Sequence, residues 1–323
     1  MKFQQLRYIV EVANQNMNIT EAAHVLFTSQ PGISKQVRLL ENELGVEIFE
    51  RNGKHIKGLT PPGKKIVAIS REIMMKMQGI RSVADEYTKP EQGVLRIATT
   101  NTQARYMLPT VVEKFSQRYP NVSLHIHQGS PTQIYDALMS DEVDLAITTE
   151  AQYLFDDVVL LPCYFWNRSV IVKPDHPLAQ CEHLTIEELG KYPLITYTFG
   201  FTGASDLDYA FNSAGILPNI VFTATDADII KTYVRMGLGV GIMASMAHTS
   251  ADKDLVAIKA DHLFRPSMTQ IAFKNGAFLR NYMYDFINYF SPHLTRTNVE
   301  KAEMLHDNSD VKKLFSNVTL EVL

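Results

Sequence analysis

The sequence predicts a protein of two folded parts, a small mainly α-helical head and a larger α/β body, joined by one long helix. Three observations carry this prediction. Apolar residues recur at helical spacing over the first 45 positions. A single apolar stripe then continues from Gly63 to Tyr87. From Gly93 onward, short β-rich runs alternate with helical stretches, which is typical of sheets flanked by helices.

The composition fits an ordinary globular protein with unevenly distributed charge. A chain of 323 residues, 46% hydrophobic and 20% charged, is long enough for two or three domains with their own cores. Residues 1–65 hold 9 Lys and Arg against 6 Asp and Glu, a charge of +3, while the remainder holds 22 against 29, or -7. A basic head on an acidic body fits a nucleic-acid partner for the head, although chance surface variation would give the same pattern.

The first residues and the cysteines bear on the compartment. The start MKFQQLRYIVEVANQN is amphipathic, unlike a signal peptide or a membrane helix, so we expect a cytoplasmic protein with no membrane association. Cys163 and Cys181 are too few for a zinc cluster, and we expect two reduced structural thiols.

The sequence of the head predicts three helices and a hairpin. Residues 3–14 form one amphipathic helix, and Asn18-Ile-Thr20 opens a short second one. The third helix is capped by Ser29 or Thr28 and ends at Gly45. Residues 46–49 and 56–59 then favour two strands around a turn at 51–54. This is the element order of a winged helix-turn-helix.

The start of the third helix is suited to contact with DNA. Short polar side chains at the N-terminal end of a recognition helix can reach base edges in the major groove, while the opposite face packs in a core. Lys35 and Arg38 suit phosphate or guanine, and the wing suits the backbone or minor groove. A solvated basic face on a small helical domain is the alternative. The candidate DNA-contacting residues are Thr28, Ser29, Gln30, Pro31, Ser34, Lys35 and Arg38, with Arg51 and Lys54 in the wing.

The long helix predicts a dimer. Its apolar residues recur at alternating threes and fours, which is the seam of a two-helix coiled coil. Two heads on such a dimer would read two half-sites of a pseudo-palindrome. The seam residues are Ile66, Ile69, Ile73, Met77, Ile80, Val83 or Ala84, and Tyr87.

The body is expected to contain parallel sheets, because strands and helices alternate along it. The expected strands are VLRIATT, VSLHIHQG, VDLAIT, RSVIVK, PLITYTF, NIVFTAT and VGIMA. The expected helices are 103–118, 131–141, 185–190, 204–214 and 226–236. A linker lies near Lys89–Gly93, and from about residue 296 we expect a terminal helix or a loosely held tail.

The segment LRYIVEVANQNMNITEAAHVLFTSQPGISKQVRLLENELGVEIFER resembles the DNA-binding head of LysR-type transcriptional regulators, and the resemblance extends over about residues 1–295. Segments such as IATTNTQARYMLP, YPLITYTFGFTG and FTATDADIIKTYVRMGLGVGIMASMA resemble the subfamily that regulates sulfur assimilation and cysteine biosynthesis. A related subfamily, which regulates the use of sulfonates, shares several of them and remains an alternative.

The resemblance implies a domain plan and a set of partners. Residues 1–60 would be the DNA-binding domain, 61–90 the dimerising linker helix, 91–295 a periplasmic-binding-protein-like effector domain of two Rossmann-like subdomains, and 296–323 a C-terminal tail. It also implies a homotetramer that binds promoter DNA and RNA polymerase, and an inducer, N-acetylserine or O-acetylserine, opposed by sulfate, sulfide or thiosulfate.

A candidate effector site follows the first expected strand of the body. Thr99-Thr-Asn-Thr-Gln103 ends the run VLRIA and opens a helix, and ligands in α/β sheets sit at such junctions. Hydroxyl and amide donors there suit a sulfate or a carboxylate, although an ordinary capped helix would look the same. The family usually has His where this chain has Asn101. The candidate residues are Thr100, Thr102 and Gln103 from this run, and Ser130, Thr149, Trp166 and Thr202 from the resemblance.

Other motifs point to no catalytic or metal chemistry. Gly237–Gly241 follows a helix and precedes a strand, the reverse of a dinucleotide loop. His125 and His127 alternate along a strand without a further ligand, and Asp226 and Asp228 most simply cap a helix. No nucleophile with its base is recognisable, so we expect no enzyme and no cofactor. A transport-type solute-binding protein would fit the body alone, but the extra head argues against it.

Overall fold

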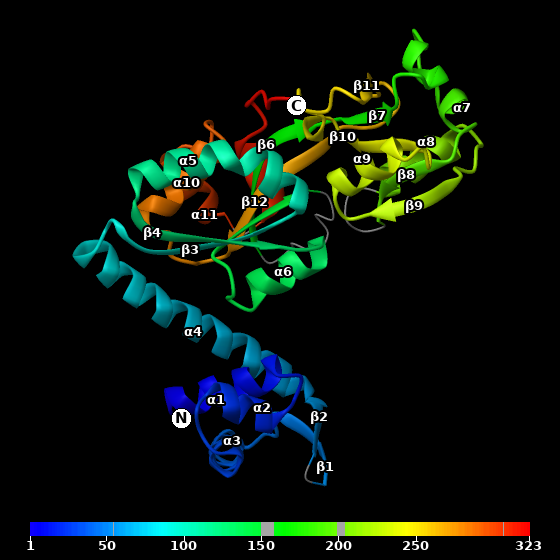
Figure 1. Cartoon of the computed structure of the whole chain (residues 1–323). Coiled ribbons are helices and arrows are strands. Elements are labelled where there is room, and N and C mark those ends of the chain that lie inside the picture. The colour runs from blue at the N-terminus through cyan, green and yellow to red at the C-terminus, as the bar shows by residue number, and fades with distance from the viewer. Residues whose placement is uncertain (54, 150–157, 199–203, 306) are drawn as a thin grey trace. The chain divides into compact units, whose positions relative to one another are not determined.

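The computed structural model describes all residues except 54, 150–157, 199–203 and 306 (Figure 1). The chain divides into two compact units, Met1–Thr88 and Lys89–Leu323. Among the described helices, none combines the length and the apolar character needed to cross a bilayer.

The first unit contains the three expected helices and the expected hairpin. Ser29 caps the third helix by accepting a hydrogen bond from the Gly32 amide at 3.2 Å, and Gly45 ends it in the left-handed region, with a φ of 70°. The buried residues of the first unit, which include Ile9, Ile33 and Leu40, form one core. The elements are α1 (Phe3–Asn14), α2 (Ile19–Val25), α3 (Gln30–Leu44), β1 (Phe49–Asn52), β2 (His55–Leu59) and α4 (Pro61–Thr88).

The first strand of the wing begins at Phe49, later than the expected start at Val46. The reason is the buried carboxylate of Glu41, whose Oε1 accepts hydrogen bonds from the amides of Ile48 and Phe49 at 3.0 and 3.2 Å. Its Oε2 pairs with Arg51 at 2.7 Å. Backbone donors at the start of the wing therefore go to a side chain of α3, which fixes the wing against that helix.

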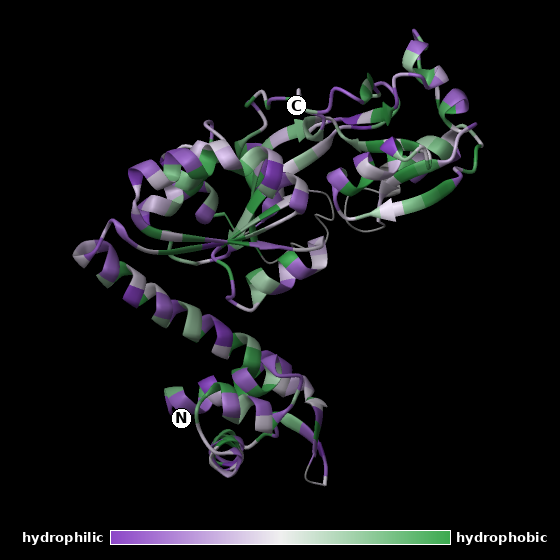
Figure 2. Cartoon of the chain, in the orientation of Figure 1, coloured by the Kyte–Doolittle hydropathy of each residue, from purple (hydrophilic) through white to green (hydrophobic). Residues whose placement is uncertain are grey.

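Helix α4 begins inside the first unit and presents apolar residues to solvent farther along. A Cβ on Gly63 would lie 1.9 Å from the carbonyl oxygen of Ile48, so only glycine allows this approach. Val67 is buried in the core of the unit, whereas Ile69, Ile80 and Tyr87 are 55%, 70% and 86% exposed. Much of the expected seam is thus open to solvent within the chain. Figure 2 shows that hydrophobic and hydrophilic residues are mixed along α4.

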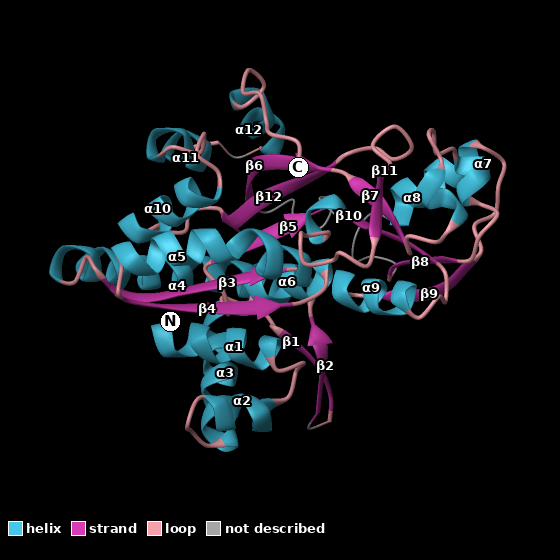
Figure 3. Ribbon diagram, turned by 45° about the horizontal axis from the view of Figure 1, so that its top comes forward, coloured by secondary structure: helices cyan, strands magenta, loops and turns pink. Residues whose placement is uncertain are grey.

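The second unit consists of two lobes, each built on a five-stranded sheet (Figure 3). The first lobe has the strand order β4-β3-β5-β12-β6 and the second β11-β7-β10-β8-β9. The first lobe contains β3 (Gln92–Thr99), β4 (Asn121–Gln128), β5 (Leu145–Thr149), β6 (Val158–Trp166) and β12 (Ser267–Lys274). The second contains β7 (Arg168–Val172), β8 (Leu194–Tyr197), β9 (Ile220–Ala224), β10 (Val240–Ala244) and β11 (Val256–Lys259).

The expectation of parallel sheets was wrong for the strands through which the chain passes between lobes. Strands β3, β4 and β5 are parallel, as are β8, β9 and β10. In contrast, β12 is antiparallel to both β5 and β6, and β7 is antiparallel to β10 and β11. The chain returns from the second lobe at the end of the first-lobe sheet where β5 finishes. Strand β12 therefore starts beside the end of β5 and runs antiparallel to it.

Helices cover both faces of each sheet. In the first lobe, α5 and α10 pack on one face and α6 on the other, and in the second lobe α8 and α9 lie on opposite faces (Figure 1). These elements are a π-helical turn η1 (Gln103–Met107), α5 (Leu108–Arg118), α6 (Pro131–Met139), α7 (Ile186–Leu189), α8 (Ala204–Ser213), α9 (Ala227–Arg235) and α10 (Asn281–Phe290), with short 3-10 turns at Pro177–Gln180 and Ser245–Ala247.

The C-terminal residues are part of the first lobe, in place of the expected single helix or loose tail. They form α11 (Arg296–Glu303) and α12 (Asn308–Leu314), whose Val299 and Val311 are buried in the core of that lobe. Asn308 bonds to the backbone of β6 through both atoms of its amide, at 2.9 and 3.0 Å. The tail thereby covers an edge strand that would otherwise expose unpaired backbone groups.

We predict that Glu41→Ala loosens the wing. The change leaves two buried amides without their acceptor and removes the ion pair of Arg51, at a cost of about 3 kcal/mol. Hydrogen exchange followed by mass spectrometry should show exchange over residues 45–60 accelerated by about two orders of magnitude. Glu43→Ala is the control, since this exposed carboxylate lies on the same helix and pairs with the N-terminal amine. Equal exchange in the two variants would contradict the assigned role of Glu41.

Candidate functional site

The first unit presents a polar and basic surface at the N-terminal end of α3. Ile33, Val37 and Leu40 bury one face of the helix, and the opposite face is open to solvent. An α-helix presented in this way fits the width of the major groove. Of the residues expected to contact DNA, Thr28, Ser29, Gln30, Pro31, Lys35 and Arg38 are exposed and Ser34 is half-buried.

The wing residues are placed differently. The Arg51 guanidinium is engaged by Glu41, so its position depends on the core side of α3. Lys54 lies outside the described residues. Lys57, on β2, is exposed.

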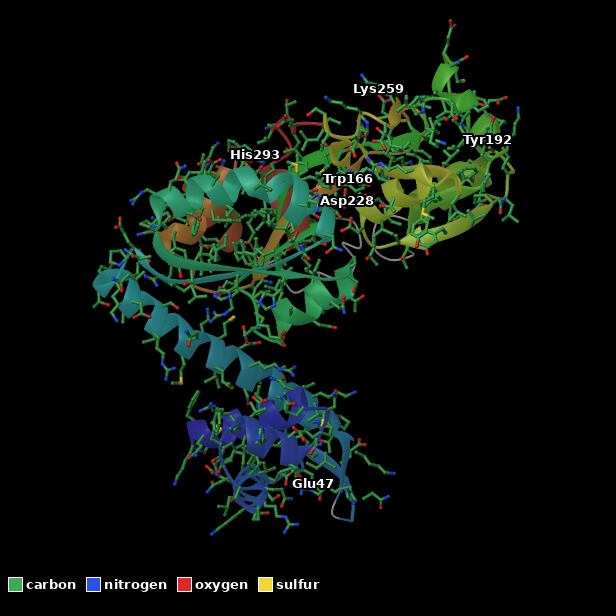
Figure 4. All side chains as sticks on the ribbon, viewed as in Figure 1. Glu47, Trp166, Tyr192, Asp228, Lys259 and His293 are labelled. Atoms are coloured by element: carbon green, nitrogen blue, oxygen red, sulfur yellow. The ribbon has the colours of Figure 1, made fainter. Side chains whose placement is uncertain are left out.

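The second unit contains a cavity between its two lobes, at the carboxyl ends of β3, β5, β8 and β10. Crevices at the carboxyl ends of parallel strands are the usual ligand sites of α/β sheets. Figure 4 labels Trp166, which lines the cavity, where the two lobes meet. The lining residues are Thr100, Thr102, Gln103, Thr149 and Trp166 from the first lobe and Tyr197, Ala244 and Met246 from the second.

The side chains that the described residues contribute to the cavity lining are electrically neutral at pH 7, and that of Gln103 is held by two hydrogen bonds. The Gln103 amide donates to the Thr269 hydroxyl at 3.2 Å, and its oxygen accepts from the Tyr164 hydroxyl. Burial raises the pKa of Tyr164 and that of Tyr197, so both hydroxyls stay protonated. The described lining therefore offers dipoles rather than charges.

Trp166 offers a donor that is not used within the described part of the chain. Its side chain is 2% exposed, and its indole Nε1 has no hydrogen-bond partner among the described residues. A buried N–H without an acceptor costs free energy, which an anionic or carbonyl oxygen in the cavity would recover.

A helix begins at the cavity wall. Helical residues start at Asn101, and the Ala104 amide donates to the Thr100 carbonyl at 3.0 Å. The first N–H groups of a helix have no acceptor within the helix and carry a partial positive charge, which favours an anion. Neutral donors and a helix N-terminus together suit a small carboxylate or oxyanion.

The cavity that the described residues line is small. Its volume is about 10 Å³, which is enough for one water molecule. A larger ligand therefore requires some of the cavity walls to move.

Five of the seven expected effector residues line this cavity. Ser130 is not among the lining residues; its hydroxyl accepts the Gln133 amide at 3.2 Å as the N-cap of α6. Thr202 lies outside the described residues. Tyr197, Ala244 and Met246 were not among the expected residues. The first two could have been predicted, because each is the last residue of a strand and ligands bind at the carboxyl ends of strands.

Among the described residues, no group of three or more His, Cys, Asp or Glu side chains could hold a metal ion.

Known proteins resemble the chain over its whole length. The model of the bacterial regulatory helix-turn-helix protein, LysR family, matches residues 3–64, and that of the LysR substrate-binding domain matches residues 88–295. The HTH-type transcriptional regulator CysB of Haemophilus influenzae is 78% identical, covering 99% of each chain. The regulator Cbl of Escherichia coli K12 is 40% identical over 96% of this chain and 99% of its own. The crystal structure of the cofactor-binding domain of Cbl, 39% identical, covers 66% of this chain and 94% of its own, with a TM-score of 0.64.

We predict that a ligand entering the cavity changes the tryptophan fluorescence of the chain. Trp166 is the single tryptophan of the sequence, so the whole signal comes from the cavity wall. Titration with sodium sulfate should give a saturable change in emission that sodium chloride of equal ionic strength does not give. A change that is identical for the two salts would argue against an oxyanion site at Trp166.

Proposed function

The chain belongs to the LysR family of bacterial helix-turn-helix transcriptional regulators, and we propose that it activates genes of sulfate assimilation and cysteine biosynthesis in response to an acetylated serine. The observation that carries the proposal is the 78% identity to a CysB regulator over nearly the whole chain, combined with a closed cavity of neutral donors. The substrate-binding domain of the protein would then sense the supply of sulfur, and the helix-turn-helix would select the promoter.

The proposed DNA contacts follow from exposure at the start of α3. Thr28, Gln30 and Ser34 reach base edges, while Lys35 and Arg38 bind phosphate or guanine. Ser29 and Pro31 shape the first turn of the helix, and their exposed atoms approach the sugar-phosphate backbone of the DNA. Arg51 supports the wing, and Lys54 is proposed as a backbone contact.

The proposed assembly is a dimer through α4 that pairs further into a tetramer. Ile69, Ile73 and Ile80 are exposed along α4 within the chain, and a second copy of the helix would bury them. Two heads then face two half-sites of promoter DNA. Regulation of transcription further requires contact with RNA polymerase.

The proposed inducer is N-acetylserine or O-acetylserine. Its carboxylate would accept hydrogen bonds from Thr100, Thr102 and the helix N-terminus, and its acetyl group would lie against Trp166 and Met246. Sulfate, sulfide or thiosulfate would oppose the inducer, because a small anion fits the same donors. Ligand binding shifts the angle between the lobes, and the assembly passes this change to the DNA.

The proposal places the protein in the cytoplasm and gives it no enzymatic activity and no cofactor other than the effector. A regulator of sulfonate use is the second candidate, supported by the 40% identity to Cbl, but the identity to CysB is almost twice as high. A transport-type solute-binding protein fits the two lobes alone and leaves the helix-turn-helix without a role.

We predict that Arg38→Ala weakens promoter binding about tenfold. If Arg38 binds phosphate, the slope of log affinity against log salt also falls by about one. Fluorescence anisotropy with a cysteine-biosynthesis promoter fragment, at several salt concentrations, measures both quantities. Lys253→Ala removes an exposed charge from the second lobe and is the control. Unchanged promoter affinity in Arg38→Ala would remove this residue from the interface.

We predict that Thr102→Val weakens N-acetylserine binding about tenfold, because one hydroxyl donor is lost at nearly constant shape. Isothermal titration of the full chain measures the affinity. The control is Thr223→Val, an exposed position on β9 that is not among the described lining residues. If neither acetylserine binds the unmodified protein, the family assignment stands and the proposed effector is wrong.

A further inference from the structure

A network of charged and polar side chains joins the two lobes next to the cavity. The Tyr106 hydroxyl, in the first lobe, donates to Asp228 Oδ1 in α9 at 2.8 Å and accepts from Lys231 Nζ at 3.1 Å. Arg105 Nε lies 2.5 Å from Asp228 Oδ2. Figure 4 labels Asp228 on the side of the second lobe that faces the first. The sequence had suggested only a capping role for this residue.

The first-lobe members of this network belong to the turn that forms the cavity wall. Thr102 and Gln103 line the cavity, and Arg105 and Tyr106 follow within the same π-helical turn. The Leu108 amide donates to the Gln103 carbonyl and closes this turn. The Tyr106 ring packs against the core of the second lobe that contains Ile230. A displacement of the second lobe therefore acts on the turn that carries two lining side chains.

Most charges of the second lobe are paired within that lobe. Lys231 is 3% exposed, and its Nζ also bonds to Asp252 at 3.0 Å and to the Ala247 carbonyl at 3.0 Å. Arg235 pairs with Asp252 at 2.9 Å and with Asp254 at 2.6 Å. Although burial opposes it, hydrogen bonds from Lys231 and Tyr106 hold the pKa of Asp228 below its ordinary value.

Because of this arrangement, breaking the contact between the lobes costs little free energy. When the lobes separate, Asp228 loses Tyr106 and Arg105 but keeps Lys231 at 2.9 Å, and Lys231 keeps Asp252. Removing one partner of a buried ion pair normally leaves an uncompensated charge, and here that cost does not arise. Arg105, whose side chain is 63% exposed, passes directly into water.

We propose that Tyr106, Arg105 and Asp228 form an interlobe latch that holds the effector cavity closed in the ligand-free protein and opens when an effector enters. The three are positioning residues, since none of them lines the cavity. The latch explains how a site with room for one water molecule admits a larger ligand, and how occupancy becomes a change of lobe angle. It rests on the proposed function only for the identity of the effector.

The decisive variant is Tyr106→Phe, which keeps the ring and removes the hydroxyl. Without the latch, a larger fraction of the protein is in the open state that admits the ligand. The variant should therefore bind N-acetylserine about fivefold more tightly than the unmodified chain. The matched control is Tyr119→Phe, which removes a similar Tyr–Asp hydrogen bond of 2.6 Å, to Asp285, within the first lobe. That control should leave the affinity unchanged.

Lobe separation is measured in the same variants without any effector. Spin labels on Cys181 in the second lobe and on Lys114→Cys in α5 report the interlobe distance by electron–electron double resonance, because Cys163 is buried. Excess unlabelled chain suppresses signals between copies. Tyr106→Phe should give a longer and broader distance distribution than Tyr119→Phe. Arg105→Gln, at the surface, should shift it in the same direction, and it replaces Tyr106→Phe if that variant misfolds.

Matching distributions in the Tyr106 and Tyr119 variants, or weaker effector binding in Tyr106→Phe, would overturn the latch. If N-acetylserine binds no variant while the ligand-free distance still lengthens in Tyr106→Phe, the latch stands and the proposed effector is wrong. The two proposals therefore fail separately.

Discussion

The chain passes directly from one lobe to the other at Asn167, and the effector region depends on this crossing. Strand β6 ends at Trp166 and β7 begins at Arg168, with a single residue between them. The Asn167 carbonyl accepts the Ser245 amide at 2.9 Å, and the Asn167 amide donates to the Leu323 carbonyl at 3.0 Å. Because the backbone is continuous and bonded here, the lobes cannot separate at this point and can only turn about it. Trp166 lies at this pivot, whereas Tyr106 and Asp228 join the lobes through side chains alone, which can part without breaking backbone hydrogen bonds.

Local patterns in the sequence predicted much of the fold. The seven expected strands correspond to β3, β4, β5, β7, β8, β9 and β10, and the expected helices agree within a few residues. The missed strands β6, β11 and β12 lack the alternation that marks a half-buried strand. In β12, Thr269 and Gln270 are polar yet buried on opposite faces, and β6 is an unbroken apolar run that contains a proline. Their places follow from pairing between segments distant in sequence, which a local pattern does not encode.

The candidate sites likewise combine residues that local sequence patterns predict with contacts between residues distant in sequence. Thr100 was predictable because it stands at the end of a recognisable strand, Thr149 came from the family resemblance, and Ser29 was predictable because capping is a local interaction. The support of Gln103 by Thr269 joins residues 166 positions apart, and the Tyr106 contact with Asp228 spans 122 positions. Neither could be read from the sequence. Arg51 shows the converse, since a basic wing residue suggests DNA while the fold pairs it with the buried Glu41.

The distribution of charge explains why this arrangement can switch. A lysine or arginine in the closed cavity would be a buried charge without compensation whenever the effector is absent, at a cost of several kcal/mol. The described part of the lining has none, so the empty state is not penalised there in this way. The charges are instead collected beside the cavity, where Arg105, Lys231 and Arg235 balance Asp228, Asp252 and Asp254 and most pairs stay within one lobe. Open and closed forms can then differ by a few kcal/mol, which is the range that the binding of one small ligand can reverse.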